Sequence, residues 1–530
     1  MSQDRRPTSR LTLFVAVLVL FAGALFAVLP GVVAPATAQD RDTLGKDLDA
    51  ILADPGLGGA DVGLVVRTLD GETLYNRSGD RRQQPASNAK LVTSAVAMEL
   101  LGPDYRFDTT AAASGPVAGG VLDGDLYLRG TGDPTMLATD YDALAAQVAA
   151  AGVTTVSGGL VADDTWFDTV RLGYGWAWDD EPYYYSAQTS ALTAAPDTDY
   201  DAGSIIVNVA PGAEGAPAVV TTEPPTDYVT IQNTAVTGAA GAEAAVTVDR
   251  VHGANTITVS GSIPADGAPT KEWMAVWEPT GYAAALFRAA LGAHGVTVTG
   301  PTTGGATPAD ATRLAAHESM PLVELAVPFL KLSNNMHAEI LMKAIGRKAA
   351  DDGSWHAGVE AVAATLPNLG IDPATVSLVD GSGLSRMDQI APDQLASLLV
   401  AASGKPWFAQ WYAALPIAGN PDRLVGGTLR NRMRGTPAEG NVHAKTGSLT
   451  GVSSLSGYVD SASGERLVFS MVTNNTIGLD AKVLEDAVAI RLAGKSGDGA
   501  RTAPAPRIED SPRQGANRRL DLECSWVKAC

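Results

Sequence analysis

Patterns typical of a helix and a hairpin occur at both ends of this chain and enclose a long segment of different character. The hairpins are expected at 62–75 and 451–474, and the helices at 43–53 and 481–493. The first hairpin has the turn dipeptide Asp70-Gly71 between its apolar runs. Because the helix and hairpin patterns lie on both sides of this segment, we expect the middle of the chain to be an insertion into one discontinuous α/β domain.

The middle of the chain, from about 109 to 275, is predicted to be rich in β-structure. Short β-branched runs such as 204–209 and 256–259 alternate there with clusters of Gly, Pro and Asp. Helical periodicity returns over 281–293 and again over 334–348.

The predicted fold class is therefore multidomain α/β, with an antiparallel sheet flanked by helices. With 530 residues the chain is too long for one domain. We expect a discontinuous catalytic domain from 39–108 and 276–494, interrupted by a large β-rich insertion, 109–275, that comprises two small nested domains. The stretch 495–530 is rich in Gly, Pro, Arg and Ser, which predicts a disordered tail.

Residues 1–38 have the pattern of an export signal. Arg5, Arg6 and Arg10 precede an apolar run, and Ala36-Thr37-Ala38 is a small-x-small cleavage site. An uncleaved membrane anchor is the alternative, since the apolar run reaches the lower limit for a spanning helix.

The short motif from Ser87 to Lys90 opens a helix whose apolar face continues through Leu91, Val96 and Leu100. A serine hydroxyl needs a base to become a nucleophile, and a lysine three residues on lies on the same helix face. An ammonium must lose its proton to act as that base, and burial beside a second cation favours this loss. We therefore predict Ser87 as nucleophile and Lys90 as general base.

Two further motifs follow in order, Ser333-Asn334-Asn335 and Lys445-Thr446-Gly447-Ser448. Each alone is weak, because a serine at a helix start is more often a cap. Together with Ser87 to Lys90, this set resembles the penicillin-recognising serine enzymes. With the segments 124–134 and 380–386, the chain resembles the three-domain, low-molecular-mass penicillin-binding proteins of actinobacterial type, which are D-alanyl-D-alanine carboxypeptidases.

The resemblance implies a role for each motif residue. Ser333 would complete the proton path to the leaving amine, and Asn335 would hold the substrate amide. Lys445 and Thr446 would bind the terminal D-alanine carboxylate, which suits a cation and a hydroxyl donor. Gly447 would admit the substrate backbone, and the oxyanion hole would be the backbone N–H groups of Ser87 and Ser448.

An aromatic and acidic stretch, 176–185, is a candidate wall of the substrate cleft. In enzymes that the chain resembles, the third residue of the stem peptide carries a free amino and carboxyl end. We expect Asp180 and Tyr185 to meet the ammonium and Arg386 to meet the carboxylate. The alternative for 176–185 is packing between domains, and for Arg386 a structural part of its turn.

Other classes of function are less well supported. A net charge of -20 argues against nucleic acid as a partner. The histidines form no pattern around a serine, no G-x-S-x-G elbow is present, and no zinc-ligand spacing occurs, so we expect no metal and no cofactor. A β-lactamase-like hydrolase and a penicillin-binding sensor without turnover remain as alternatives. No E-x-x-L-N segment supports the former, and the sensor would lack Ser87 or Lys90.

We therefore expect an exported D-alanyl-D-alanine carboxypeptidase, extracellular or wall-associated, with endopeptidase activity on cross-links left open. Its partners would be peptidoglycan stem peptides, and β-lactam antibiotics would inhibit it covalently.

Overall fold

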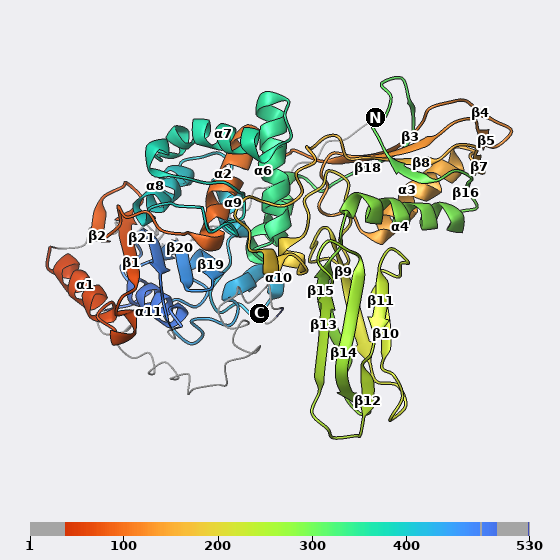
Figure 1. Ribbon diagram of the computed structural model, residues 1–530. Coiled ribbons are helices and arrows are strands. Elements are labelled where there is room, and N and C mark those ends of the chain that lie inside the picture. The colour runs from red at the N-terminus through yellow and green to blue at the C-terminus, as the bar shows by residue number, and fades with distance from the viewer. Residues whose placement is uncertain (1–37, 478–479, 496–527, 529–530) are drawn as a thin grey trace, which may run out of the picture. The chain divides into compact units, whose positions relative to one another are not determined.

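The computed structural model describes residues 38–477, 480–495 and 528 (Figure 1). The predicted export signal, except for Ala38, lies outside the described residues. So does the predicted tail, except for Lys495 and Lys528. Among the described residues, no helix combines the length and apolarity needed to cross a membrane.

A five-stranded antiparallel sheet joins the two ends of the chain in the order β19-β20-β21-β1-β2 (Figure 1). Its strands are β1 (Asp61–Thr68), β2 (Thr73–Arg77), β19 (His443–Leu449), β20 (Val452–Asp460) and β21 (Arg466–Asn474). Both predicted hairpins are present, and β1 pairs with β21 along its whole length. Strand β19 lies at one edge of the sheet.

Both faces of this sheet are covered, which explains the nearly continuous apolar sequence of its strands. Leu64 and Val66 pack in a cluster with α1 (Ala38–Ile51) and α11 (Lys482–Ala493). Val65, between them, points to the opposite face and packs in the larger helical core.

The helical layer on that opposite face is built around α2, whose residues from Ala89 to Met98 are all buried. A helix buried on every side belongs at the centre of a core. The other helices here are α5 (Leu322–Lys331), α6 (Asn335–Ala350), α7 (Trp355–Thr365), α8 (Pro392–Ser403), α9 (Phe408–Ala414) and α10 (Arg423–Gly426), and α2 itself spans Ala89–Leu100. Single 3-10 turns are η1 (Pro55–Leu57), η2 (Ala86–Asn88), η3 (Trp178–Asp180), η4 (Tyr184–Ser186), η5 (Leu366–Leu369), η6 (Pro373–Thr375) and η7 (Gly427–Leu429).

The inserted region contains four sheets and two helices that share one apolar cluster. One sheet has the order β17-β8-β6-β3-β18 and another β16-β7-β5-β4. Their strands are β3 (Asp108–Ala113), β4 (Val117–Ala118), β5 (Val121–Leu122), β6 (Leu126–Gly130), β7 (Thr155–Val156), β8 (Leu160–Asp163), β16 (Thr297–Val298), β17 (Thr302–Gly304) and β18 (Thr312–Glu318). The helices α3 (Ala138–Ala150) and α4 (Pro279–Ala293) pack against each other.

The other two sheets have the orders β10-β9-β15 and β11-β14-β12, with β13 paired to β14. Their strands are β9 (Ser204–Ala210), β10 (Val219–Glu223), β11 (Thr230–Asn233), β12 (Val236–Gly238), β13 (Ala245–Arg250), β14 (Thr256–Pro264) and β15 (Thr270–Ala275). The runs expected at 204–209 and 256–259 are thus strands.

One predicted boundary differs from the structure. The sequence analysis placed the return to the catalytic domain at residue 276, but 279–318 still belongs to the inserted region. Strands β16, β17 and β18 pair with β7, β8 and β3, respectively. Periodicity within α4 is the same whichever domain it covers, so only the strand pairing reveals its place. The return to the helical layer comes with α5.

Candidate active site

Ser87 lies in η2, which runs directly into α2. Ala86, just before it, has a left-handed backbone with φ of 47°, so the chain turns sharply there. The Nζ of Lys90, one turn further on, donates to the Ser87 Oγ at 2.8 Å. Both side chains are buried. The structure thus brings together, away from bulk water, the hydroxyl and the amine that the sequence paired.

The Lys90 Nζ also donates to the Asn335 Oδ1 at 2.7 Å and to the backbone oxygen of Ser382 at 2.9 Å. Of these three partners, only the Ser87 hydroxyl has a hydrogen to give. A neutral amine can keep its two hydrogens on the amide and carbonyl oxygens and direct its lone pair at the hydroxyl. This arrangement allows the Ser87 hydroxyl to transfer its proton to the Lys90 amine.

The middle motif connects the two lysines. Ser333, with φ of 58°, forms the bend between α5 and α6, and its Oγ accepts from the Lys445 Nζ at 2.8 Å. Asn335 is the first residue of α6, and its Nδ2 donates to the Tyr185 backbone oxygen at 2.7 Å. Its two amide atoms therefore join Lys90 to the aromatic stretch of the insertion.

Asn334, between them, makes its side-chain contacts elsewhere. Its Oδ1 accepts from the His337 backbone N–H at 3.3 Å and caps α6, while its Nδ2 donates to the Asp201 Oδ1 at 3.1 Å. His337 is buried, and its Nε2 lies 2.9 Å from the Tyr200 oxygen. Because a carbonyl only accepts, that nitrogen carries the hydrogen, and His337 has a structural role.

Strand β19 packs closely on the turn that carries Ser87. A Cβ on Gly447 would lie 2.9 Å from the Ser87 backbone nitrogen, 2.9 Å from the Pro85 oxygen and 2.3 Å from the Ser454 Oγ. The Asn88 Nδ2 donates to the Lys445 oxygen at 3.1 Å and ties the two segments together. Only glycine permits this approach, which aligns the edge of the sheet with the serine.

Thr446 and Ser448, on the same strand, are also buried. The Thr446 Oγ1 donates to the Thr428 Oγ1 at 2.8 Å. Thr428, in η7, was not among the sequence-predicted residues, because nothing near it in the chain marks it. The Lys445 Nζ lies 2.9 Å from the Thr446 backbone oxygen, so a cation and this pair of hydroxyls belong to neighbouring positions, a suitable setting for a carboxylate.

A buried glutamate that the sequence analysis missed supports the Lys90 site. Glu339, on α6, accepts from the backbone N–H of Gly381 at 2.9 Å and of Ser382 at 2.8 Å, and from the Trp355 Nε1 at 2.7 Å. Burial raises the pKa of Glu339, and the nearby carboxylate of Asp380 adds to the effect. Glu339 thereby orients the Ser382 carbonyl that receives Lys90. The turn at 380–386 was the available signal for this part of the site.

Three residues proposed for side-chain recognition lie in two segments that approach each other. The Tyr185 hydroxyl donates to the Asp180 Oδ1 at 3.0 Å. Burial raises the pKa of Asp180, and the positive charge of Arg386 opposes this rise. The Arg386 Nη1 donates to the Thr450 oxygen at 2.8 Å. The carboxylate of Asp180 and the guanidinium of Arg386 thus attract each other electrostatically.

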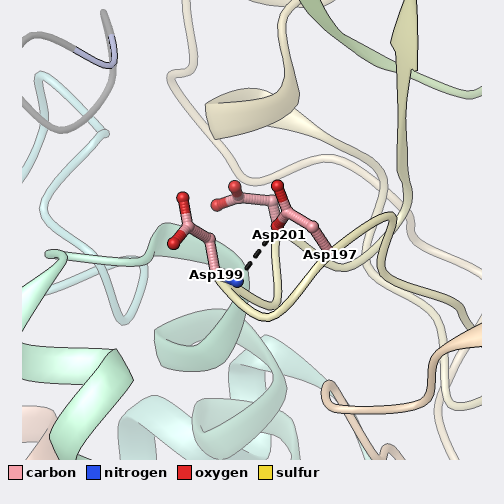
Figure 2. A group of neighbouring side chains, drawn as sticks. All are labelled: Asp197, Asp199 and Asp201. Atoms are coloured by element: carbon pink, nitrogen blue, oxygen red, sulfur yellow. Dashed lines mark hydrogen bonds between the residues drawn. The ribbon is translucent and has the colours of Figure 1, made fainter. Parts of the chain in front are cut away.

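Three carboxylates, Asp197, Asp199 and Asp201, gather on one loop (Figure 2). Within the part of the chain that the structure describes, they form the one group of potential ligands close enough to hold a metal ion, with atoms within 4.8 Å of one another. No motif pointed to this loop. The Asp199 backbone N–H donates to the Asp197 Oδ1 at 3.0 Å, as drawn in Figure 2.

The sheet edge, the buried helix and the Ser-Lys pair together define a serine enzyme of the penicillin-recognising class. The chain belongs to the D-Ala-D-Ala carboxypeptidase 3 (S13) family, whose model matches residues 44–495. It is 50% identical over 502 residues to a D-alanyl-D-alanine carboxypeptidase of Actinomadura sp. (strain R39), covering 94% of this chain and 92% of the relative.

Comparison with solved structures supports the same class of protein. Penicillin-binding protein 4 from Haemophilus influenzae matches with a TM-score of 0.72 and 26% identity over 84% of this chain and 98% of that protein. The same protein complexed with a β-lactam matches with a TM-score of 0.67 and 25% identity, over the same shares of both chains.

These findings confirm the predicted family, the fold class and the activity, a serine-type D-alanyl-D-alanine carboxypeptidase.

Proposed function

We propose that this chain cleaves the terminal D-alanyl-D-alanine bond of peptidoglycan stem peptides through an acyl-enzyme on Ser87. The Ser87 Oγ attacks the carbonyl carbon of the penultimate D-alanine. The C–N bond then breaks, and the leaving amine of the terminal D-alanine takes the proton that Ser87 lost. Water afterwards splits the ester and restores the hydroxyl. The observation that carries the proposal is the contact of the Lys90 Nζ with Ser87, Asn335 and Ser382.

Lys90 is the general base in this scheme. Two of its hydrogen-bond partners only accept, so they orient the amine toward the Ser87 hydroxyl. The Asn335 amide, next to the same amine, is placed to hold the backbone of the scissile peptide.

Ser333 and Lys445 serve the leaving group. The Ser333 Oγ lies 2.8 Å from the Lys445 Nζ, so a proton delivered to Ser333 can pass to the departing amine beside it. Lys445 and Thr446 bind the carboxylate of the terminal D-alanine, and Thr428 extends this set of donors. A substrate without a free carboxylate loses these contacts.

The oxyanion hole consists of the backbone N–H groups of Ser87 and Ser448. Because β19 is an edge strand, part of its backbone has no neighbouring strand and is free to face the cleft. The close contact of Gly447 with the Ser87 nitrogen supports this role, since it brings the two N–H groups to one place.

Asp180 and Tyr185 bind the ammonium, and Arg386 the carboxylate, of a zwitterionic third residue in the stem peptide. Their opposite charges and the Tyr185 to Asp180 hydrogen bond support this pairing. A half-buried charged contact contributes on the order of 1 to 2 kcal/mol, which corresponds to roughly a tenfold change in rate.

The pattern over residues 1–38 supports export, because peptidoglycan lies outside the cell membrane. The enzyme is then extracellular or wall-associated, or membrane-anchored where the signal is retained. β-Lactams acylate Ser87 in place of the stem peptide and leave slowly.

Labelling with a fluorescent penicillin tests the nucleophile and base. Ser87→Ala abolishes both labelling and release of D-alanine, and Lys90→Ala slows acylation by about 10²- to 10⁴-fold. Lys348→Ala, which changes an exposed lysine on α6, is the matched control and keeps both activities. Penicillin that still attaches covalently to the Ser87→Ala protein contradicts the proposal. Mass spectrometry of products from stem peptide and cross-linked dimer also separates carboxypeptidase from endopeptidase turnover.

Stem peptides with diaminopimelate, lysine or norleucine at the third position test the recognition residues. Asp180→Asn slows turnover about tenfold for the two substrates with an ammonium, and Arg386→Gln does so for diaminopimelate alone. Equal losses on all three substrates would show that these residues only support the fold.

A further inference from the structure

A pocket next to the middle motif shares Tyr185 and Asn335 with the proposed reaction site, but its other lining residues take no part in the proposed reaction. These other lining residues are Tyr184, Asp199, Asp201, Leu332, Asn334, Arg423 and Lys528. Asn334 lies in the chain beside Asn335, and Tyr184 beside Tyr185, so the pocket adjoins the site of Lys90.

The side chain of Lys528 lies in this pocket. Its Nζ is 3.0 Å from the Asp199 Oδ2 and 2.5 Å from the Asp201 Oδ2. It is also 4.6 Å from the ring centre of Tyr184 and 4.7 Å from that of Trp273. Two carboxylates and two aromatic faces therefore surround one ammonium, an arrangement that binds organic cations.

The charges in the pocket require such a cation. Arg423 pairs with Asp199, its Nη2 lying 2.6 Å from the Oδ2, so one carboxylate already has a partner. Asp201 is buried, and burial raises its pKa to about 6 while the charge of Lys528 opposes the rise. A buried carboxylate without a cation is costly. After Arg423 has balanced Asp199, the carboxylate of Asp201 still needs one positive charge, which Lys528 supplies.

An ammonium fits this place better than a metal ion. The Asn334 Nδ2 donates to the Asp201 Oδ1 at 3.1 Å, and the Arg423 guanidinium covers Asp199. Hydrogen-bond donors that point at a ligand oxygen repel a metal ion bound there, whereas an ammonium adds its own hydrogens to the remaining lone pairs. The aromatic rings of Tyr184 and Trp273 offer a metal no ligand atom, but they attract an alkylammonium.

We propose that Tyr184, Trp273, Asp199 and Asp201 form a binding site for a primary ammonium on an alkyl chain, which Lys528 of the same chain fills. The site, called here the ammonium cage, does not depend on the acyl-enzyme chemistry. Added alkylammonium groups, such as a lysine side chain, compete with Lys528 for it.

Reductive methylation of the full-length protein, followed by mass spectrometry, tests whether Lys528 is held in the cage. Lys528 reacts at least tenfold more slowly than the exposed Lys348, and Asp201→Asn removes most of this protection. Glu243→Gln, which changes an exposed carboxylate in the loop between β12 and β13, leaves the protection unchanged. Equal reaction rates for Lys528 and Lys348 in the unaltered protein would overturn the proposal.

Calorimetry with N-acetyl-lysine methylamide tests whether the cage binds an added alkylammonium group. The Lys528→Gln protein binds this probe at least tenfold more tightly than the unaltered protein, because its cage is free. The norleucine analogue does not bind, and a second change, Asp201→Asn, abolishes binding. No saturable binding to Lys528→Gln overturns the proposal. Because neither measurement requires turnover, and circular dichroism reports that each variant is folded, this result is independent of the proposed function.

Discussion

Replacing Gly447 by alanine tests whether the close packing of β19 on the Ser87 turn sets the rate of acylation. The added Cβ would lie 2.9 Å from both the Ser87 nitrogen and the Pro85 oxygen, where ordinary contacts begin at 3.4 Å. The Ser454 hydroxyl, at 2.3 Å, can rotate, but the two backbone atoms cannot. The strand and the turn must therefore separate by about half an ångström.

The separation has two calculable effects. Overpacking of this kind costs about 1 to 3 kcal/mol of the free energy of unfolding. Removing an oxyanion-hole donor lowers rates by about 10²- to 10³-fold, and displacing one weakens it rather than removing it. We therefore expect Gly447→Ala to slow acylation by penicillin about 10- to 100-fold.

Stopped-flow acylation with a chromogenic β-lactam measures the rate, and urea unfolding measures the stability. Gly304→Ala, in the strand β17, is the control, because a Cβ there meets nothing within 4 Å. It leaves both quantities unchanged. If Gly447→Ala acylates within about threefold of the original rate, the inference that the contact at Gly447 positions the oxyanion hole is refuted.

Two further predictions concern buried groups. Glu339→Gln leaves the backbone N–H of Gly381 or Ser382 without an acceptor, so the Ser382 carbonyl that accepts from Lys90 shifts. We expect kcat on stem peptide to fall about tenfold with KM nearly unchanged, and a larger change in KM than in kcat would argue against this role. Burial lowers the pKa of His337 from 6.5 to about 4, so the folded protein binds its proton later than the unfolded chain. Its contribution to stability is complete above pH 6.5 and declines by about 3 kcal/mol as the pH falls to 4. Urea unfolding at several pH values measures this slope, which His337→Gln reduces; an unchanged slope would show that His337 is not its source.

Much of the site could be predicted because many of its residues lie close together in short, regular segments of the chain. Ser87 and Lys90 are one helical turn apart, and helix geometry alone places them on one face. The alternation of Ser333, Asn334 and Asn335 likewise follows from their position at the start of α6, where the middle residue caps the helix. Such relations need no knowledge of the rest of the chain.

The contributions of Ser382, Glu339 and Thr428 could not be predicted in the same way. Ser382 acts through its backbone oxygen, so its side chain gives no signal, and Glu339 looks like any acidic residue in a helix. The end of the insertion was misplaced for a related reason. Residues 279–318 are recognisable only by the strands with which they pair.

By itself, the sequence determined the fold class, through helix and strand periodicity, and the class of chemistry, through the order of three motifs that resemble a known family. Both can be recognised from short segments of the chain. Only the tertiary structure decided which distant groups meet: the contacts of Lys90 with Asn335 and Ser382, the contact of Gly447 with the Ser87 turn, and the cage around Lys528. These contacts arise from the packing of a sheet edge, a buried helix and an inserted region. Packing depends on the whole chain at once, and no short pattern encodes it.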